Sequence, residues 1–245
     1  MKTLIIGDIH NHWENAEDII KQISPDKTVF VGDYFDSIGD SEADAKRTAI
    51  WLKQSLEDPS RTHLIGNHDI PYIKHSRWTD CPGYTPLKSL FINEVLSKED
   101  WKKLKFFSVI DNKWLVSHSG LHVHYIVTKF SVADSLNLQD LEIWLERETE
   151  KAWKHLNEGT FHWFFSKGQY RSDKDNSLYG GLLWQDWNVE FQGIPDINQI
   201  VGHTYDSQYP RVRRWDTIGS INYCIDCIPF EVLLIEDGKE EIIRV

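Results

Sequence analysis

Five short apolar runs along this chain each end at a small residue, usually glycine, and are followed at once by a residue that can bind a metal. Apolar runs of this length are typical of buried strands, and a glycine after them is typical of a tight turn. Sites in open α/β sheets form at the carboxyl ends of strands, so we expect the five turns to meet in one crevice. The segments are residues 3–10, 28–33, 63–68, 114–118 and 199–203.

Helical periodicity separates these strands in the first half of the chain. Apolar residues recur at helical spacing over residues 13–23, and Pro25 ends that stretch. Serine and aspartate at 41–44 and at 97–100 resemble capping boxes, and the first opens a helix that we expect to run to about Leu56. This alternation predicts an α/β fold with parallel strands joined by right-handed crossovers.

The second half follows a different pattern. Residues 106–117 and 231–244 indicate two hairpins, the latter around Asp237-Gly238. Residues 136–157 form the longest helical segment, with a glycine stop after it. Residues 159–181 are rich in Gly, Ser and Asp, so we expect a surface loop there.

The spread of the five turns bears on the number of domains. They extend from residue 7 to residue 203, so a boundary anywhere between would split the site. We therefore expect a single domain over residues 1–245, with 119–181 as a helical and loop insertion that covers part of the crevice.

The composition limits the cellular environments and the binding partners that suit this chain. Eleven Trp, eleven Phe and nine Tyr provide large apolar surfaces for a core, and the net charge of −11 argues against stable binding of nucleic acid. No apolar run approaches the roughly 18 residues of a membrane helix, and a strand begins too early for a signal peptide. We expect no membrane association and a cytoplasmic location.

The three cysteines are consistent with that location, because an odd and low count suits a reducing compartment. Cys224 and Cys227 have the spacing of a redox motif. They lie in a β-type run rather than at the start of a helix, so we interpret them as buried structural cysteines.

Six residues at the turns form a mixed set of oxygen and imidazole ligands, enough for two divalent cations that share a carboxylate. Asp8 and His10 lie two residues apart, so in extended backbone their side chains point to the same face. Asp33 is the natural bridge between cations about 3.5–4 Å apart, the arrangement that promotes in-line displacement at phosphorus. The set is Asp8, His10, Asp33, Asn67, His118 and His203.

The ligand types also suggest which metals bind. An ion bound mainly by neutral ligands would still be able to lower the pKa of its bound water toward about 7, which gives hydroxide near neutral pH. We expect Mn²⁺ first among the candidates, and Fe and Zn²⁺ also suit this mixture.

His68 is the candidate general acid. It follows Asn67 directly, so its ring should point away from the ion that Asn67 binds and toward a leaving alkoxide. Asp36 is placed to fix its tautomer by accepting from one ring nitrogen, although it could instead only cap the turn. We expect Asp69 to support its own turn.

These motifs together resemble the calcineurin-like metallophosphoesterases, and most closely the serine/threonine phosphoprotein phosphatase branch with its bacterial and phage relatives. The resemblance spans nearly the whole chain and is weakest over 119–181. The motifs are Gly-Asp-Ile-His at 7–10, Gly-Asp-Tyr-Phe-Asp at 32–36, Gly-Asn-His-Asp at 66–69, Ser-His-Ser-Gly at 117–120 and Gly-His-Thr at 202–204, with further likeness at 182–186 and 222–226.

The resemblance implies a four-layer α-β-β-α sandwich in which two mixed β-sheets pack together and are flanked by helices. It assigns Asp8, His10 and Asp33 to the first metal. It assigns Asp33 with the amide and the two later histidines (Asn67, His118 and His203) to the second. It also gives His68 and Asp36 the acid and orienting roles.

Two positions depart from the family pattern. Phosphoprotein phosphatases carry a phosphate-binding Arg where this chain has Ser37, and serine cannot grip phosphate bidentately. Arg171, with Asn67, is our candidate for binding the substrate. Tyr205 stands where many phosphodiesterase relatives have a second histidine, which leaves the first metal's shell to water. Weaker candidates for the missing arginine are Arg47, Arg211, Arg213 and Arg214.

Other conspicuous side chains have simpler interpretations. We expect His122 and His124 to be ordinary loop or strand histidines. The aromatic segments at 163–165 and 184–187 could stack a nucleobase, but we favour core packing.

The expected function is hydrolysis of phosphate monoesters by metal-activated hydroxide, with a phosphorylated small molecule, nucleotide or phosphoprotein as substrate. Hydrolysis of dinucleoside polyphosphates or other nucleotides is the alternative. A nuclease is disfavoured by the lack of basic patches and by Tyr205. A non-catalytic scaffold is disfavoured because every expected ligand and His68 are retained.

Overall fold

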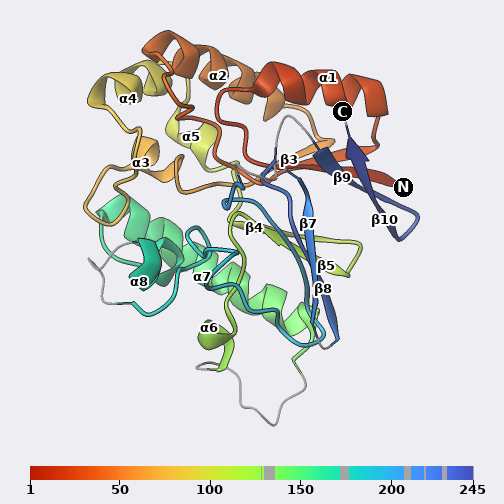
Figure 1. The fold of residues 1–245 in the computed structure, drawn as a ribbon. Coiled ribbons are helices and arrows are strands. Elements are labelled where there is room, and N and C mark those ends of the chain that lie inside the picture. Colours follow the sequence, from red (N-terminus) through yellow and green to blue (C-terminus); the bar gives the residue numbers. More distant parts are fainter. Residues whose placement is uncertain are drawn as a thin grey trace.

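Two mixed five-stranded sheets form the centre of the molecule (Figure 1). The computed structural model describes residues 1–127, 129, 136–171, 177–206, 211–217, 219–227 and 231–244. The first sheet has the order β10-β9-β1-β2-β3, in which β1, β2 and β3 are parallel to one another and β9 is antiparallel to both of its neighbours, β1 and β10. Its strands are β1 (Lys2–Ile6), β2 (Lys27–Phe30), β3 (Arg61–His63), β9 (Glu231–Glu236) and β10 (Lys239–Arg244).

The second sheet has the order β4-β5-β6-β8-β7. Strands β5, β6 and β8 are parallel, and the edge strands β4 and β7 are antiparallel to their neighbours. Its strands are β4 (Phe107–Ile110), β5 (Trp114–Ser117), β6 (Asn198–Val201), β7 (Arg213–Thr217) and β8 (Ser220–Cys224).

The sheets pack together because apolar residues alternate along the strands. Ile5 and Val29 of the first sheet belong to one buried cluster with Val116 and Ile200 of the second. The neighbouring position Leu4 points to the opposite face and belongs to the cluster that includes the helices. The expected sandwich of two mixed sheets flanked by helices is confirmed.

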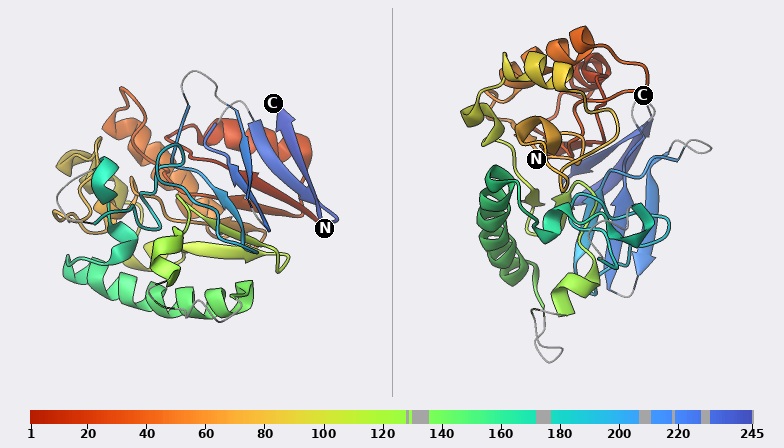
Figure 2. Two further views of the ribbon diagram at one scale, coloured as in Figure 1. Left: turned by 60° about the horizontal axis from the view of Figure 1, so that its bottom comes forward. Right: turned by 90° about the vertical axis from the view of Figure 1, so that its left-hand side faces the viewer.

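Helices cover the outer faces of the sheets (Figure 2). In the two figures α1 and α2 lie on one side, and α7 lies on the other. The elements outside the sheets are α1 (Trp13–Ile23), α2 (Glu42–Ser55), α3 (Ile70–Ile73), α4 (Pro86–Asn93), α5 (Lys98–Trp101), α6 (Val123–Val127), α7 (Leu138–Glu158), η1 (Trp163–Phe165) and α8 (Gly168–Arg171).

Local sequence signals placed most of these elements correctly. Both capping boxes are present, at the starts of α2 and α5. Both hairpins form as antiparallel pairs, and α7 ends at Gly159, whose φ of 66° is left-handed. Cys224 and Cys227 are buried and free, as expected of structural cysteines.

The expectation of a surface loop at 159–181 was wrong for much of that segment. Phe164 and Phe165 are fully buried, and η1 and α8 form there. The polar composition concealed a close approach of two chain segments. A Cβ on Gly168 would lie 2.4 Å from the backbone nitrogen of Gly180, so only glycine fits. Residues 172–176 of the predicted loop lie outside the described residues.

The ends of the described chain meet in one sheet, since β9 pairs with β1. Because strands far apart in sequence share this sheet, we propose that residues 1–245 form one domain. Of the helices that the structure describes, none combines the length and the apolarity needed to cross a membrane.

The capping box at α2 supports a stability prediction. Ser41→Ala removes the hydroxyl that accepts from the backbone nitrogen of Asp44, and we expect a loss of about 1 kcal/mol of unfolding free energy. Urea denaturation followed by circular dichroism measures it. Ser41→Thr keeps the hydroxyl that accepts from Asp44 and donates to its carboxylate, so it should retain most of the stability, and equal losses in both variants would contradict the capping role.

Candidate metal centre

All six expected ligands follow the carboxyl ends of strands, and their side chains converge on one space between these strand ends. Five of the six side chains form two groups, and Asp33 belongs to both of them. One group is Asp8, His10 and Asp33, and the other is Asp33, His118 and His203. Within each group the potential ligand atoms lie within 4.8 Å of one another. This is the arrangement expected for a carboxylate that bridges two cations.

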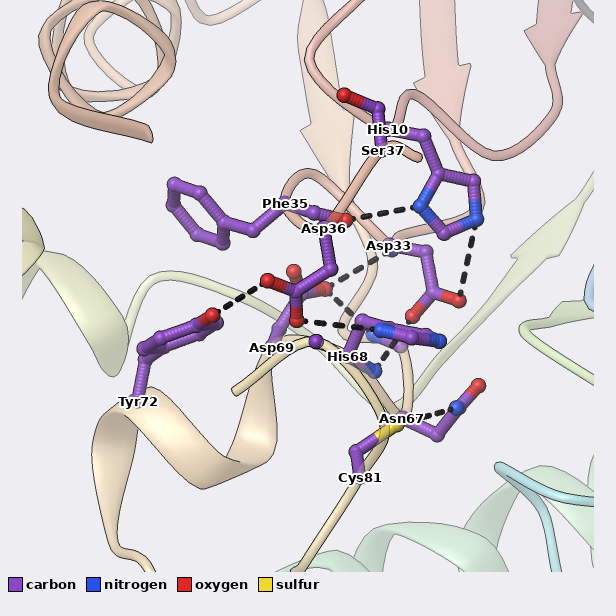
Figure 3. Close-up of polar contacts among 12 residues, drawn as sticks. His10, Asp33, Phe35, Asp36, Ser37, Asn67, His68, Asp69, Tyr72 and Cys81 are labelled. Carbon is purple, nitrogen blue, oxygen red and sulfur yellow. Dashed lines mark hydrogen bonds and ion pairs between the residues drawn. The ribbon is translucent and has the colours of Figure 1, made fainter. Parts of the chain in front are cut away.

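Asn67 completes the second group. Its carbonyl Oδ1 lies 2.7 Å from Nε2 of His118, while its Nδ2 donates to Sγ of Cys81 at 3.2 Å. The thiol therefore orients the amide so that its oxygen faces the crevice (Figure 3).

The tautomers of two histidines fit metal binding. Nδ1 of His118 donates to the backbone oxygen of Val31 at 3.0 Å, so Nε2 is the nitrogen that would present a lone pair to a metal once the ring is neutral. That nitrogen lies 3.4 Å from Oδ2 of Asp33 and 3.2 Å from Nδ1 of His203. Lone pairs that face one another at these distances need a proton or a cation between them. His10 repeats the pattern, with Nδ1 held by the Phe35 oxygen at 2.8 Å.

Burial and mutual repulsion perturb the acidic groups strongly. Burial, followed by the nearby charge of Asp226, raises the pKa of Asp8 well above its usual value. Burial also acts to raise the pKa of Asp33, but the surrounding histidines, His118 first, bring it below its usual value. A crevice that holds these carboxylates out of water requires positive charge, and divalent cations supply it.

The histidines respond in opposite directions. Burial would lower the pKa of His118, but Asp33 and Asp8 raise it to about 9. Burial, His118 and the charge of Arg171 hold the pKa of His203 well below its usual range. In the absence of metal, one ring therefore retains a proton where a cation would bind.

The residue just before two of the ligands, Asn67 and His203, has to be glycine, because a larger side chain would not fit there. A Cβ on Gly202 would overlap Oδ1 of Asp8, and a Cβ on Gly66 would overlap Oδ1 of Asp33. The turns can therefore bring ligand carboxylates against backbone only because no side chain intervenes.

Asp69 supports these turns, as expected. Its carboxylate accepts from the backbone nitrogens of Asp33, Tyr34 and Gly66 at 2.8–2.9 Å. Burial and the charge of Asp33 raise its pKa to about 7.

His68 lies beside the metal ligands with Asp36 behind it (Figure 3). Its backbone nitrogen donates to Oδ1 of Asp33 at 2.8 Å, and its Nδ1 lies 3.2 Å from Oδ2 of Asp36. Burial acts to lower the pKa of His68, but Asp33 and Asp36 raise it well above its usual value. The ring is therefore held in its protonated form, with Nε2 as the remaining donor.

Arg171, at the end of α8, lies near the centre. Its Nη2 donates to Oδ2 of Asp186 at 2.6 Å. Its charge acts on His203 and on Asp226. Ser37 instead accepts from Nδ2 of Asn11 at 3.2 Å.

The weaker arginine candidates have other partners or lie exposed on the surface. Arg47 pairs with Asp44, and Arg214 pairs with Asp216. Arg213 donates to Asn188, to the backbone of Thr204 and to Cys224. Arg211 is exposed.

The aromatic and histidine segments pack as expected. Trp163 stacks on Trp144, and Trp184 is 5% exposed with its edge toward the ring of His203. His122 is buried and stacks on Tyr179, and burial lowers its pKa to about 4.

Sequence reasoning missed three residues of the centre. Asp226 follows β8 at the same edge as the other ligands, and burial raises its pKa to about 7. An aspartate just after an apolar strand is the signal that identified Asp8, and it was available here as well. Cys81, which contacts Asn67, and Lys88, whose Nζ donates to Asp36, carry no comparable signal, because each lies in a segment without a ligand turn.

Comparisons with known proteins show the family of this chain. The family model described as calcineurin-like phosphoesterase matches residues 1–207. A search of curated proteins gives no match.

Solved structures are similar to this chain at low sequence identity. A protein serine/threonine phosphatase from Saccharomyces cerevisiae, with similarity to human phosphatase PP5, is 14% identical with a TM-score of 0.50, covering 100% of this chain and 80% of that one. A metallophosphoesterase from Sphaerobacter thermophilus is 13% identical with a TM-score of 0.46, covering 100% and 88%. The E. coli phosphoesterase Yfce is 11% identical with a TM-score of 0.43, covering 100% and 93%.

The close approach at Gly202 gives a test that needs no substrate. Gly202→Ala should displace Asp8 and weaken Mn²⁺ binding by about 10- to 100-fold, as measured by isothermal titration calorimetry. Gly238→Ala in the turn between β9 and β10 is the control, since no described residue lies within 4 Å of the added methyl group. Its φ of 78° makes alanine strained there, so we expect a loss of stability without a loss of Mn²⁺ affinity. Unchanged Mn²⁺ affinity in folded Gly202→Ala would contradict the placement of Asp8.

Proposed function

Because the chain belongs to the calcineurin-like phosphoesterase family and is a metal-dependent phosphoesterase, we propose that it hydrolyses phosphate monoesters with two divalent cations, preferably Mn²⁺. The observation that carries this proposal is the pair of ligand groups that share Asp33. The three free cysteines fit a reducing compartment, so we also propose a cytoplasmic location.

The residues that would hold the cations follow from the two groups. Asp8 and His10 would bind the first, Asn67 and the two later histidines (His118 and His203) the second, and Asp33 both. When bound, the cations neutralise phosphate charge and lower the pKa of water, which provides a nucleophile near neutral pH.

His68 would donate the proton to the leaving oxygen. It is next to a ligand in sequence, its Nδ1 is held by Asp36, and the nearby carboxylates favour its protonated form. A protonated histidine held by a carboxylate at one ring nitrogen can protonate an alkoxide from the other nitrogen as the phosphorus–oxygen bond breaks.

Arg171 would bind phosphate oxygens together with Asn67. Asp186 accepts from one of its nitrogens, and among the described residues no other acceptor binds the guanidinium, which leaves donors for a bidentate contact. The side chain is 32% exposed, so it can reach a substrate while anchored.

Packing of the aromatic residues favours a monoester over a nucleotide. Trp184 is 5% exposed, and Trp163 stacks on both Trp144 and Tyr125, which supports core packing over stacking of a nucleobase. Assay of the Mn²⁺-loaded protein with p-nitrophenyl phosphate, its bis-ester, phosphopeptides and diadenosine tetraphosphate tests the proposal. Turnover of the tetraphosphate alone would favour the nucleotide alternative, and no turnover of any compound would reject both.

Two substitutions should separate proton donation from metal binding. His68→Asn should retain Mn²⁺ and lose about 10²- to 10⁴-fold in kcat on phenyl phosphate, a substrate with a poor leaving group. Asp33→Asn should lose Mn²⁺, as measured by inductively coupled plasma mass spectrometry. Equal metal content in Asp33→Asn and the parent would refute the bridging role.

The arginine assignment has its own test. Arg171→Met should raise KM for phenyl phosphate by about 10-fold or more, since a charge-assisted contact to phosphate is lost. Arg47→Met removes a guanidinium that pairs with Asp44 at the surface and should leave KM unchanged. A KM in Arg171→Met equal to the parent value would show that another group binds the phosphate.

A further inference from the structure

A buried lysine lies behind the pair formed by His68 and Asp36. Lys88, in the first turn of α4, is 5% exposed. Its Nζ donates to Oδ1 of Asp36 at 3.0 Å, to Oδ1 of Asp40 at 2.6 Å and to the backbone oxygen of Gly83 at 3.1 Å. Lysine is almost never this buried unless it is paired, so three acceptors around one ammonium mark a specific site.

The two oxygens of Asp36 have different partners. Oδ1 accepts from Lys88 and also from the hydroxyl of Tyr72 at 2.5 Å. Oδ2 lies 3.2 Å from Nδ1 of His68. Tyr72 and His68 lie on opposite sides of the carboxylate (Figure 3).

We propose that Lys88 and Tyr72 are positioning residues that hold Oδ1 of Asp36, so that Oδ2 keeps the His68 ring aimed at the leaving group. This inference rests on the proposed role of His68 as general acid. Neither residue touches the metal ligands named above, and both act through Asp36.

The backbone shows why Asp36 needs such anchors. Its φ of 68° lies in the left-handed region, which is unfavourable for a residue with a Cβ. Gly83 packs so closely that a Cβ there would lie 2.7 Å from Cβ of Asp36. Two charge-assisted hydrogen bonds on Oδ1 offset this cost and fix the plane of the carboxylate.

Both donors are in the form that the proposal requires. Burial acts to lower the pKa of Lys88, but Asp40 and Asp36 hold it above its usual value, so the ammonium stays charged. Burial and Asp36 raise the pKa of Tyr72, so its hydroxyl stays protonated.

Asp40 connects this cluster to the first ligand turn. Besides Lys88, it accepts from Nδ2 of Asn11 at 2.9 Å, and Asn11 follows His10 directly. Lys88 thus links the carboxylate behind the general acid with the loop that carries a metal ligand.

The experiment uses two esters that differ in their need for a proton. p-Nitrophenyl phosphate has a good leaving group, and phenyl phosphate has a poor one that depends on the general acid. Lys88→Met and Tyr72→Phe are assayed with Mn²⁺ on both esters. Lys46→Met, which breaks a surface pair with Glu94, and Tyr84→Phe, whose ring neighbours that of Tyr72, are the matched controls.

We expect Lys88→Met to lower kcat on phenyl phosphate by about 10-fold or more and on p-nitrophenyl phosphate by less than about 3-fold. KM and Mn²⁺ content should stay at parent values. Tyr72→Phe should show the same bias to a smaller degree, and both controls should match the parent. In a His68→Asn background, neither substitution should alter the ratio of the two rates.

Equal falls in kcat on both esters, or a bias that persists without His68, would overturn the proposal. If Lys88→Met does not fold, Tyr72→Phe decides by the same ratio, since it removes one hydroxyl from the same oxygen. Failure of the parent to hydrolyse either ester would reject the proposed function instead. Hydrolysis by the parent with no bias in the variants would reject the positioning roles alone.

Discussion

The structure of this centre depends on one buried carboxylate, Asp33. It is 2% exposed, belongs to both potential ligand groups, and accepts from the backbone nitrogen of His68. A carboxylate so far from water is stable as an anion only when positive groups and hydrogen-bond donors surround it. The turns, the glycines beside them and the three backbone donors that Asp69 holds all serve to keep this side chain in place.

The charges around Asp33 explain why the crevice suits cations. Asp8, Asp33 and Asp226 are all buried, and burial is the main cause that raises the pKa values of Asp8 and Asp226. The imidazoles offset part of this charge, with nitrogens whose tautomers are set by backbone oxygens. Ligands oriented from behind in this way are pre-organised, so binding requires little further ordering.

Separate sets of contacts hold the metal ligands and the candidate acid. Asn67 is oriented by Cys81, whereas Asp36 is held by Tyr72 and Lys88 from α3 and α4. Asp36 is anchored in the helical layer, whereas the metal ligands follow the strand ends. The two sets meet where the backbone nitrogen of His68 donates to Asp33 and where Asp40 links Lys88 to Asn11. Metal content has to be measured beside kcat to separate an effect on the acid from an effect on the metal.

The sequence by itself determined the strand ends and their ligands, because a strand, a glycine and a metal-binding side chain are encoded within a few residues. Capping boxes and hairpins are likewise encoded by residues that lie close together in the sequence. Only the tertiary structure revealed that Lys88 and Asp36, 52 positions apart, share a buried contact, and that Phe164 and Phe165 are buried within a polar segment. Such contacts depend on how distant elements pack, and no short-range pattern of residue types encodes that packing.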